Sequence, residues 1–376
     1  MLEGVHLTVL IGPGLPVPAP KVVMDALVAV QVNNGKDKSG FQLTLGISKD
    51  SVLLTTMLPA GYFDPMITRV ILIVTLGGFP HVIMDGIVTR QELTPSSEPG
   101  QSTLTITGED LSVLMDVVEM PFKVFPGMPV IARVYEILAK YLAFGIVPIG
   151  IPPFIFDVPI PTNKINRQTG TDLQYLKKLA NDHGYVFYVE PGPLPGQSIA
   201  YWGPDIRLPV PQRALSVNMD ANTNVESMSF SLDGLAKKIV VVTVFDPVKN
   251  RIPVVVPIPN MNLFKPPLGA RPTIPSKVEF PDYLSKEPSL PSVLNRVLGV
   301  LARSSDSISV SGSLDVMRYG GILRNRMIAG VRGAGLAYDG FYYVNSVTHN
   351  IKRGEYKQNF QLSRDGLISI SPRVVV

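Results

Sequence analysis

The chain has 376 residues, enough for about two to four domains. It contains no cysteine, which excludes disulfides, thiolate metal sites and cysteine nucleophiles. Its net charge of +4 is too small for a protein that binds nucleic acid by neutralising phosphates. No two of its four histidines are close in sequence, which excludes a His-x-x-x-His zinc site.

The surface of this protein must be poor in charge. Charged residues make up 17% of the chain, against a typical value of about 25%, and the mean hydropathy is +0.24. Such a chain is either a membrane protein or a subunit whose surface is covered by neighbours. Its most apolar run, 141–156, contains prolines and is shorter than the ~20 residues of a membrane-spanning helix. No secretory signal is evident, so we expect an assembly subunit without a transmembrane segment.

The first ~110 residues read as β-strands. Phe41, Leu43 and Leu45 alternate with Gln42 and Thr44, which is the period of a half-buried strand. Further strands are expected at 22–32, 53–57, 69–76, 82–93 and 102–107. Turns are expected at 77–78 and 85–86. The pattern predicts an antiparallel barrel or sandwich at 21–118, preceded by an N-terminal arm at 1–20.

The middle of the chain has helical spacing. One helix is expected at 130–144, and a second begins at Thr171, where Thr171 and Gln174 form a capping box. Gly184 ends the second helix, and a strand at 185–189 follows. These elements predict a small α/β insertion domain at 119–210.

β-rich sequence then resumes. Strands are expected at 225–232, 237–245, 307–317, 324–331, 341–351 and 356–363, and the last two form a hairpin. Proline recurs densely between 247 and 291, and a short helix is expected at 293–303. We therefore predict a second barrel at 211–250 and 305–370, a Pro-rich excursion at 251–304 and a C-terminal tail at 371–376. The fold class is α+β, mainly β.

The two β-rich ends look like an internal repeat. A strand, a glycine turn, an Asp-Gly pair and a long strand occur in the same order in both. The Asp-Gly pairs begin at Asp85 and Asp339, an offset of 339 − 85 = 254. Leu104 and Phe360 occupy matching strands at an offset of 360 − 104 = 256. The similarity indicates a duplication, although two unrelated β-meanders would also share some of these turns and strand spacings.

No catalytic group of residues stands out. Glu109 and Asp110 are adjacent, so they cannot flank a glycosidic bond as a carboxylate pair, and we expect them to cap the helical turn that follows. His349 lacks a nucleophile partner and is expected to be structural. Neither a cofactor nor a metal is expected, and the protein is not expected to be an enzyme.

Other residues are candidates for binding partners. Trp202 either stacks on a sugar or anchors a core or interface. Arg324 and Arg326 alternate onto one strand face, where they either line a pore, meet an acidic partner or face solvent. The full set of interface candidates is Phe41, Leu43, Leu45, Trp202, Arg324, Arg326, Tyr342, Tyr356 and Phe360.

Several stretches resemble the phage late control protein D family, which includes contractile-tail baseplate hubs and the N-terminal part of VgrG spikes. The resembling stretches are 340–349, 354–356, 360–366, 171–180, 184–189 and 225–230. The resemblance covers roughly residues 20–370, and its motifs are diffuse but occur in the family's order. The sequences at 338–340 and 352–358 most resemble those of the hubs of extracellular contractile injection systems.

The resemblance implies a structural role. In such hubs each chain carries two tube domains, and three chains form a pseudo-hexameric ring that joins a trimeric spike to a hexameric inner tube. Implied partners are two further copies of the chain, a separate spike protein, the inner tube protein and other baseplate proteins, without nucleic-acid specificity. Polar strand positions such as Thr44, Lys357 and Asn359 are then expected to line an axial channel. A spike-forming β-helix is not seen before the chain stops at Val376, so the spike is expected to be a separate protein.

The resemblance also implies assembly in the bacterial cytoplasm and incorporation into a phage tail or a tail-like particle. The Pro-rich excursion is the candidate for gripping a neighbouring chain. Two alternatives stay open: an enzyme that acts on cell-wall glycans, and a β-rich carbohydrate-binding module built around Trp202.

Overall fold

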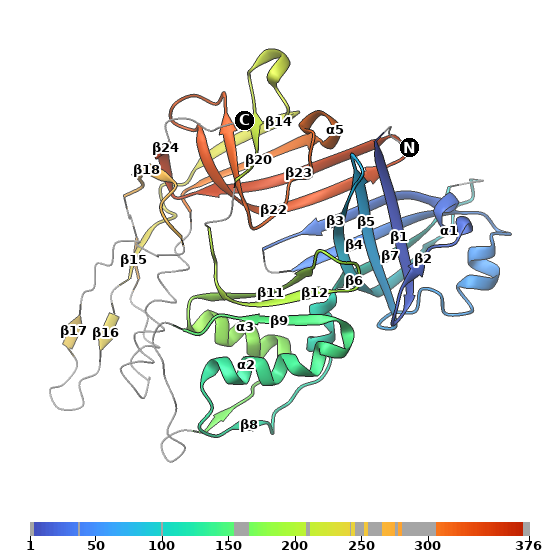
Figure 1. The fold of residues 1–376 in the computed structure, drawn as a ribbon, viewed down its shortest axis with the longest axis horizontal. Helices are drawn as coiled ribbons and strands as arrows, with labels where there is room; N and C mark the ends of the chain where they lie inside the picture. Colours follow the sequence, from blue (N-terminus) through green and yellow to red (C-terminus); the bar gives the residue numbers. More distant parts are fainter. Residues whose placement is uncertain are drawn as a thin grey trace.

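The computed structural model describes residues 4–36, 38–98, 101–153, 165–207, 211–240, 242–244, 252–254, 265–274, 277–279 and 306–370. The helix expected at 293–303, most of the Pro-rich excursion and the tail at 371–376 lie outside these residues. The described chain is mainly β, which confirms the expected fold class. In Figure 1 long strands fill the upper part of the molecule, and the helices α2 and α3 lie below them.

The first β unit consists of five strands. β1 (Val5–Pro13) and the two-residue β2 (Val17–Pro18) extend it at one edge. Its strands are β3 (Leu27–Asn34), β4 (Ser39–Ile47), β5 (Thr68–Leu76), β6 (Phe79–Thr94) and β7 (Ser102–Asp110). They pair in the order β3-β4-β7-β6-β5, and β1 adds to β5. In β4 every second residue from Ser39 to Ile47 is buried, as the alternation of Phe41, Leu43 and Leu45 predicts.

The second β unit repeats this arrangement. Its strands are β14 (Ser227–Leu232), β20 (Ile308–Asp315), β21 (Ile328–Arg332), β22 (Gly340–Lys352) and β23 (Glu355–Arg364). They pair in the order β14-β20-β23-β22-β21, so strands in the same chain order occupy the same places as in the first unit. A parallel strand, β13 (Gln212–Ser216), adds to β21, and the short helix α5 (Val316–Tyr319) follows β20.

Local details support the repeat. β6 bulges between Val88 and Arg90, and β22 bulges between Val344 and Ser346. The carbonyl oxygens of Val88 and Val344 accept hydrogen bonds from the backbone N–H groups of Met66 and Arg326, at 2.7 and 2.8 Å. Both donors have left-handed backbone, with φ of 64° and 58°.

The bulges correct the alignment expected from the sequence. They match Val88 with Val344, an offset of 344 − 88 = 256, and Ile106 with Phe360, an offset of 360 − 106 = 254. Asp85 therefore does not correspond to Asp339. Asp85 and Gly86 lie inside β6 and form no turn, because β6 continues through them to pair with β5.

The two β units share one sheet and one core. β22 pairs with β3 from Val347↔Asn34 to Lys352↔Ala29, which joins the units edge to edge (Figure 1). We call this pairing the junction. Strand pairing then runs unbroken from β14 to β2, and a single hydrophobic cluster contains side chains of both units.

The insertion lies between β7 and β13 and has a hydrophobic cluster of its own. It contains η2 (Leu111–Asp116), β8 (Val124–Phe125), α2 (Val130–Leu138), η3 (Ala139–Phe144), β9 (Ile146–Gly150), β10 (Asn166–Arg167), α3 (Asp172–Asp182), β11 (Tyr185–Pro191) and β12 (Ser198–Pro204). The hydroxyl of Thr171 accepts from the N–H of Gln174, the helix cap that the sequence predicts. Gly184 has φ of 68° just beyond the end of α3.

The expected strand at 22–32 is confirmed from Leu27 onward but wrong before it, and the expected strand at 53–57 is wrong throughout. The chain forms α1 (Lys21–Ala26) before β3, because Pro20 begins a helical turn with its fixed φ of −62°. Residues Leu53–Met57 form the π-helical η1, on which Leu53 is buried and neighbouring side chains are not. Short apolar runs of this kind do not distinguish a strand from a helical turn.

Small strand pairs accompany the Pro-rich segment. They are β15 (Lys238–Val240) with β19 (Lys277–Glu279), β16 (Val242–Val244) with β17 (Ile252–Val254), and β18 (Gly269–Pro272) with β24 (Gly366–Ser369). η4 (Asp220–Asn222) lies in the turn before β14.

Candidate functional site

One face of the continuous sheet carries uncharged polar side chains across seven neighbouring strands. In the strands from β14 through β20, β23, β22, β3 and β4 to β7, most of these hydroxyl and amide groups lie directly opposite one another. The residues of this polar face are Ser227, Ser229, Ser309, Ser311, Ser313, Asn359, Gln361, Ser346, Thr348, Asn350, Gln31, Asn33, Gln42, Thr44, Thr105 and Thr107. All of them are exposed or half-buried.

The polar face has side-chain hydrogen bonds of its own. The hydroxyls of Ser227 and Ser313 lie 2.8 Å apart. At the junction, the amide of Gln31 donates to the Asn350 side-chain oxygen at 3.2 Å. These contacts connect neighbouring strands and still leave the side chains exposed to water.

Charged side chains stand at the margin of the polar face, in pairs of opposite sign. Glu109 pairs with Lys38 at 2.7 Å, and Arg90 pairs with Glu92 at 3.0 Å. Lys357, one of the expected lumen residues, pairs with Glu226 at 2.8 Å and with Glu355 at 3.2 Å. The polar face is therefore close to electrically neutral.

Most of the expected interface residues lie on the opposite, apolar side of these strands. Phe41, Leu43 and Leu45 of β4, Tyr342 of β22, and Tyr356 and Phe360 of β23 are buried in the shared core. Their alternation with polar residues marks the buried face of a strand. The same alternation does not reveal whether the core or a partner covers that face. A partner cannot reach these side chains in this fold, so they are corrected from interface to core residues.

Trp202 is also a core residue. It lies on β12 with no exposed surface, its indole N–H donates to the carbonyl of Leu176 at 3.3 Å, and Tyr185 packs edge-on against it. A sugar cannot stack on a ring that is covered on both faces. This burial removes the basis of the carbohydrate-binding alternative.

Arg324 and Arg326 connect parts of the chain. They precede β21 and do not alternate on a strand, which corrects the expectation. The guanidinium of Arg326 stacks on Tyr188 of β11 at 3.7 Å, pairs with Glu190 at 3.3 Å and donates to the Gly35 carbonyl at 3.0 Å. Arg324 contacts His81 of the first unit at 2.9 Å. Arg326 thus holds the insertion against both β units.

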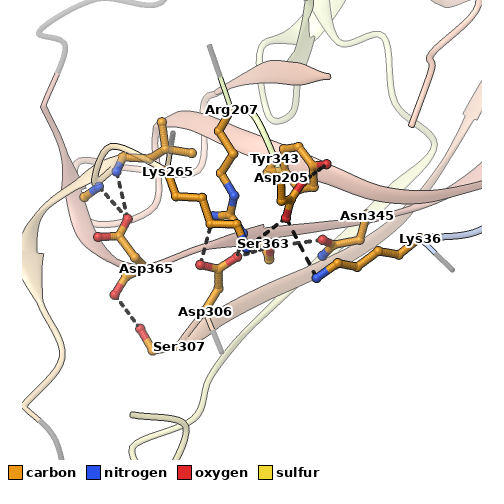
Figure 2. Close-up of polar contacts among 12 residues, drawn as sticks. Lys36, Asp205, Arg207, Lys265, Asp306, Ser307, Tyr343, Asn345, Ser363 and Asp365 are labelled. Atoms are coloured by element: carbon orange, nitrogen blue, oxygen red, sulfur yellow. Dashed lines mark hydrogen bonds and ion pairs between the residues drawn. The ribbon is translucent and has the colours of Figure 1, made fainter. Parts of the chain in front are cut away.

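A second polar cluster is largely buried, with Asp205, Arg207, Tyr343 and Ser363 all buried. Figure 2 shows its polar contacts. Arg207 forms a bidentate pair with Asp306 at 3.0 and 2.9 Å, and Asp306 accepts from the Ser363 hydroxyl. Asp205 accepts from the Tyr343 hydroxyl at 2.7 Å and pairs with Lys265 at 2.9 Å. We call these residues the fastening cluster.

The fastening cluster joins segments that are far apart in sequence. Asp205 and Arg207 end the insertion, Lys265 belongs to the Pro-rich segment, and Tyr343 lies on β22. Burial alone would raise the pKa of Asp205, but Lys265, Lys36 and Arg207 outweigh burial and lower it to about 2. The carboxylate is therefore charged at neutral pH, as an ion-pair partner must be.

The Pro-rich segment rejoins the second β unit next to the fastening cluster. The Asp365 carboxylate accepts from the backbone N–H groups of Leu268 and Gly269 at 2.8 and 3.1 Å. β18 then pairs with β24. Part of the expected excursion is thus fastened to the second β unit, which composition alone did not indicate.

The expected cap of the helical turn is confirmed for Asp110 but is wrong for Glu109, which pairs with Lys38 instead. Asp110 is buried and caps η2, accepting from the N–H groups of Ser112 at 2.9 Å and Ser39 at 2.7 Å. His349 lies 2.7 Å from the Tyr356 hydroxyl. Burial, with a smaller effect of Arg324, lowers the pKa of His349 to about 3, so the ring is neutral. Among the described residues no three His, Asp or Glu side chains gather as metal ligands.

Within the described part of the chain, no helix is both long enough and apolar enough to cross a membrane.

Comparisons with known proteins place the fold. No family model and no curated protein sequence matches the chain. A tail protein from Neisseria meningitidis superposes with a TM-score of 0.63 at 16% identity, covering 97% of this chain and 98% of that one. The 43 kDa tail protein of prophage MuSo2 from Shewanella oneidensis gives 0.59 at 12% identity, covering 96% and 100%.

A third similar structure is an Escherichia coli component of the type VI secretion system, described as similar to tail proteins of bacteriophage T4. It gives a TM-score of 0.51 at 10% identity, covering 93% of this chain and 75% of that chain. The chain therefore has the fold of phage tail and type VI secretion proteins, which confirms at the level of the fold the resemblance expected from its sequence.

Proposed function

We propose that this protein is a structural baseplate hub of a contractile injection system or phage tail. Three chains form a ring whose six β units surround an axial channel, and the ring joins a separate trimeric spike to the hexameric inner tube. The observation that carries this proposal is the neutral polar face. It extends over both β units of a chain that has a tail-protein fold.

The chemistry of the polar face suits a channel. Fixed charges would retain a cargo of opposite sign, whereas hydroxyl and amide groups exchange hydrogen bonds with water and with cargo at similar energy. Thr44 and Asn359 lie within this face, and Lys357 lies at its margin with its charge paired. We assign the face to the channel lining, as proposed for these residues from the sequence.

The remaining surface suits burial by partners. Large apolar side chains are widely exposed, including Phe122 at 91%, Leu336 at 89% and Leu15 at 86%. They come from the insertion, the second unit and the N-terminal arm, and exposed apolar groups at several sites are typical of a chain with several neighbours. The spike, the tube protein, other baseplate proteins and further copies of the chain are the partners proposed for these surfaces.

The Pro-rich segment is the proposed grip on a neighbouring chain. Since Lys265 and the backbone of Leu268 and Gly269 fasten its return to the body, a deletion that tests the grip must spare them. Removal of residues 247–262 should abolish particle assembly and leave a folded chain. Normal particles after this deletion would contradict the grip.

Native mass spectrometry tests the hub. The purified chain, alone and co-expressed with a candidate spike protein, should give a mass of three times 40.9 kDa or a complex of three chains with three spike chains. A monodisperse monomer under both conditions would overturn the proposal. The Phe122→Ser variant is the control for aggregates larger than the trimer. If exposed apolar groups cause such aggregates, this variant should reduce them and leave the trimer unchanged.

A further inference from the structure

Among the strands that the structure describes, one place that is filled in the second unit has no strand in the first unit. In the second unit, the pairing of β22 with β21 ends at Tyr343, before the bulge at Asn345, and the half of β22 beyond the bulge pairs with β3 at the junction. In the first unit, the pairing of β6 with β5 ends at Ile87, before the matching bulge at Thr89. The remaining half of β6 pairs with β7 on one side, and no described strand pairs with its other side. Side chains from Arg90 to Thr94 are all exposed.

The strand that would fill this place has a counterpart as well. β3 fills it in the second unit, and β14 is the strand equivalent to β3 in the repeat. The registers against β4 and β20 match Gln31 with Ser229 and Val32 with Phe230. No described strand pairs with the outer edge of β14.

The outer edge of β14 lacks the features that protect free strand edges. Natural edge strands carry charges, prolines or bulges that prevent pairing with other chains. β14 has the sequence Ser-Met-Ser-Phe-Ser-Leu, without a charge or a proline, and it pairs with β20 without a bulge. Leu232 at its end is 43% exposed, and Leu93 on the free half of β6 is 45% exposed.

We propose that β14 of one chain pairs antiparallel with the second half of β6 in the next chain, and that this contact reproduces the junction between molecules. Carried over from the junction, the register places Phe230 opposite Leu93 and Ser229 opposite Thr94. Ser231 then lies opposite Glu92, and Leu232 opposite Gln91.

This register fits the side chains on both strands. The exposed Leu93 meets the half-buried Phe230, so apolar surface is covered on the core side of the sheet. Ser229 and Thr94 meet on the other side, where Gln31 and Asn350 meet at the junction. The polar face thereby continues from one chain to the next.

The proposal rests on the proposed ring and adds the strands and the register that close it. The contact joins two different surfaces, so it is heterologous, and it closes when the rotation between units divides the circle evenly. Inside the chain the same contact already relates the two β units. Repetition of one contact within and between chains gives every β unit equivalent neighbours.

Cysteine cross-linking tests the register, because the chain has no cysteine of its own. Directly opposite residues on antiparallel strands have Cβ atoms about 4.5–5.5 Å apart, within or near disulfide reach. Ser229→Cys and Thr94→Cys are placed in separate chains, which are mixed and oxidised. We expect the 40.9 kDa band to shift to covalent dimers. Each single variant alone should stay monomeric on the denaturing gel.

Two control pairs complete the experiment. Gln31→Cys with Asn350→Cys in one chain is the equivalent pair at the junction and should form an intramolecular disulfide. Ser229→Cys with Glu92→Cys is displaced by two residues and should cross-link far less. Trimers in solution with no Ser229–Thr94 cross-link would overturn the strand pairing but not the hub. Monomers both alone and with the co-expressed spike would overturn both.

Discussion

Arg69 and Asp85 face each other on neighbouring strands, β5 and β6, and form a bidentate ion pair with both N–O distances at 2.7 Å. Both side chains are buried. The same guanidinium donates to the carbonyl oxygens of Phe144 and Gly196, at 3.0 and 3.1 Å. The Ser198 hydroxyl donates to Asp85 at 3.1 Å. One ion pair therefore holds the insertion against the first β unit, and Arg326 holds it against both units.

Removal of one partner of this pair should destabilise the protein strongly. Asp85→Ala leaves the Arg69 guanidinium buried without its counter-charge, which typically costs about 3–5 kcal/mol. Urea denaturation followed by circular dichroism measures the loss. Glu92→Ala removes a partner from the exposed pair with Arg90 and should cost less than about 1 kcal/mol. Similar losses for the two variants would contradict the role assigned to Asp85.

The fastening cluster should make the protein sensitive to acid. The folded pKa of Asp205 is lowered to about 2, below an unfolded value of about 3.9, so its contribution is present above about pH 4. It is lost as the pH falls toward 2, and it should amount to about 2 kcal/mol.

The stability of Asp205→Asn should therefore fall less steeply than that of the parent between pH 4 and pH 2. Denaturant titrations at several pH values measure both slopes. Asp50→Asn, at an exposed carboxylate, is the matched control. Equal slopes for the parent and Asp205→Asn would show that the cluster does not hold the carboxylate charged.

Replacement of Trp202 separates a core role from a binding role. Trp202→Ala opens a large cavity beside Tyr185 and Leu176, and it should cost about 3–5 kcal/mol. Trp202→Phe keeps most of the volume and should lose less. A glycan array probed with the parent chain should show no binding that depends on Trp202. Sugar binding that Trp202→Phe abolishes in a folded chain would favour the carbohydrate-binding alternative.

Gln358 is a buried amide whose loss should be felt locally. Its side chain accepts from the N–H of Leu323 and donates to the Leu323 carbonyl, both at 2.9 Å. Gln358→Leu leaves these two backbone groups unpaired and should cost about 2–4 kcal/mol. The neighbouring Asn359→Ala, on the exposed polar face, should cost less than about 0.5 kcal/mol. A neutral Gln358→Leu would mean that water replaces both hydrogen bonds.

Much of the fold follows from local sequence signals. Alternation fixed β4 and the β22–β23 hairpin, and the capping box fixed the start of α3, because these signals depend on neighbouring residues alone. The strand expected at 53–57 failed for the same reason. The five apolar and β-branched residues at 53–57 favour a strand locally. Tertiary packing instead buries Leu53 on η1, and the chain after η1 reaches β6, where the Met66 N–H donates to the Val88 carbonyl.

The candidate site was harder to predict. Alternation separates the two faces of a strand but does not reveal which face a neighbour covers, so Phe41 and Phe360 were expected at an interface and lie in the core. The same alternation also marks the polar face, and Thr44 and Asn359 of this face are among the residues that the sequence predicts for the channel lining. The fastening cluster joins Asp205, Lys265 and Asp306, which are too far apart in sequence for any local pattern to connect them.

Cryo-electron microscopy of the chain co-expressed with its spike tests the central claim most directly. The account predicts a particle with a threefold axis, six β units around it, and the polar face of β14, β20, β23, β22, β3, β4 and β7 turned toward the axial channel. A ring in which Gln42 and Asn359 face outward would contradict the assignment of the channel lining. A particle that contains a single copy of the chain would contradict the hub itself.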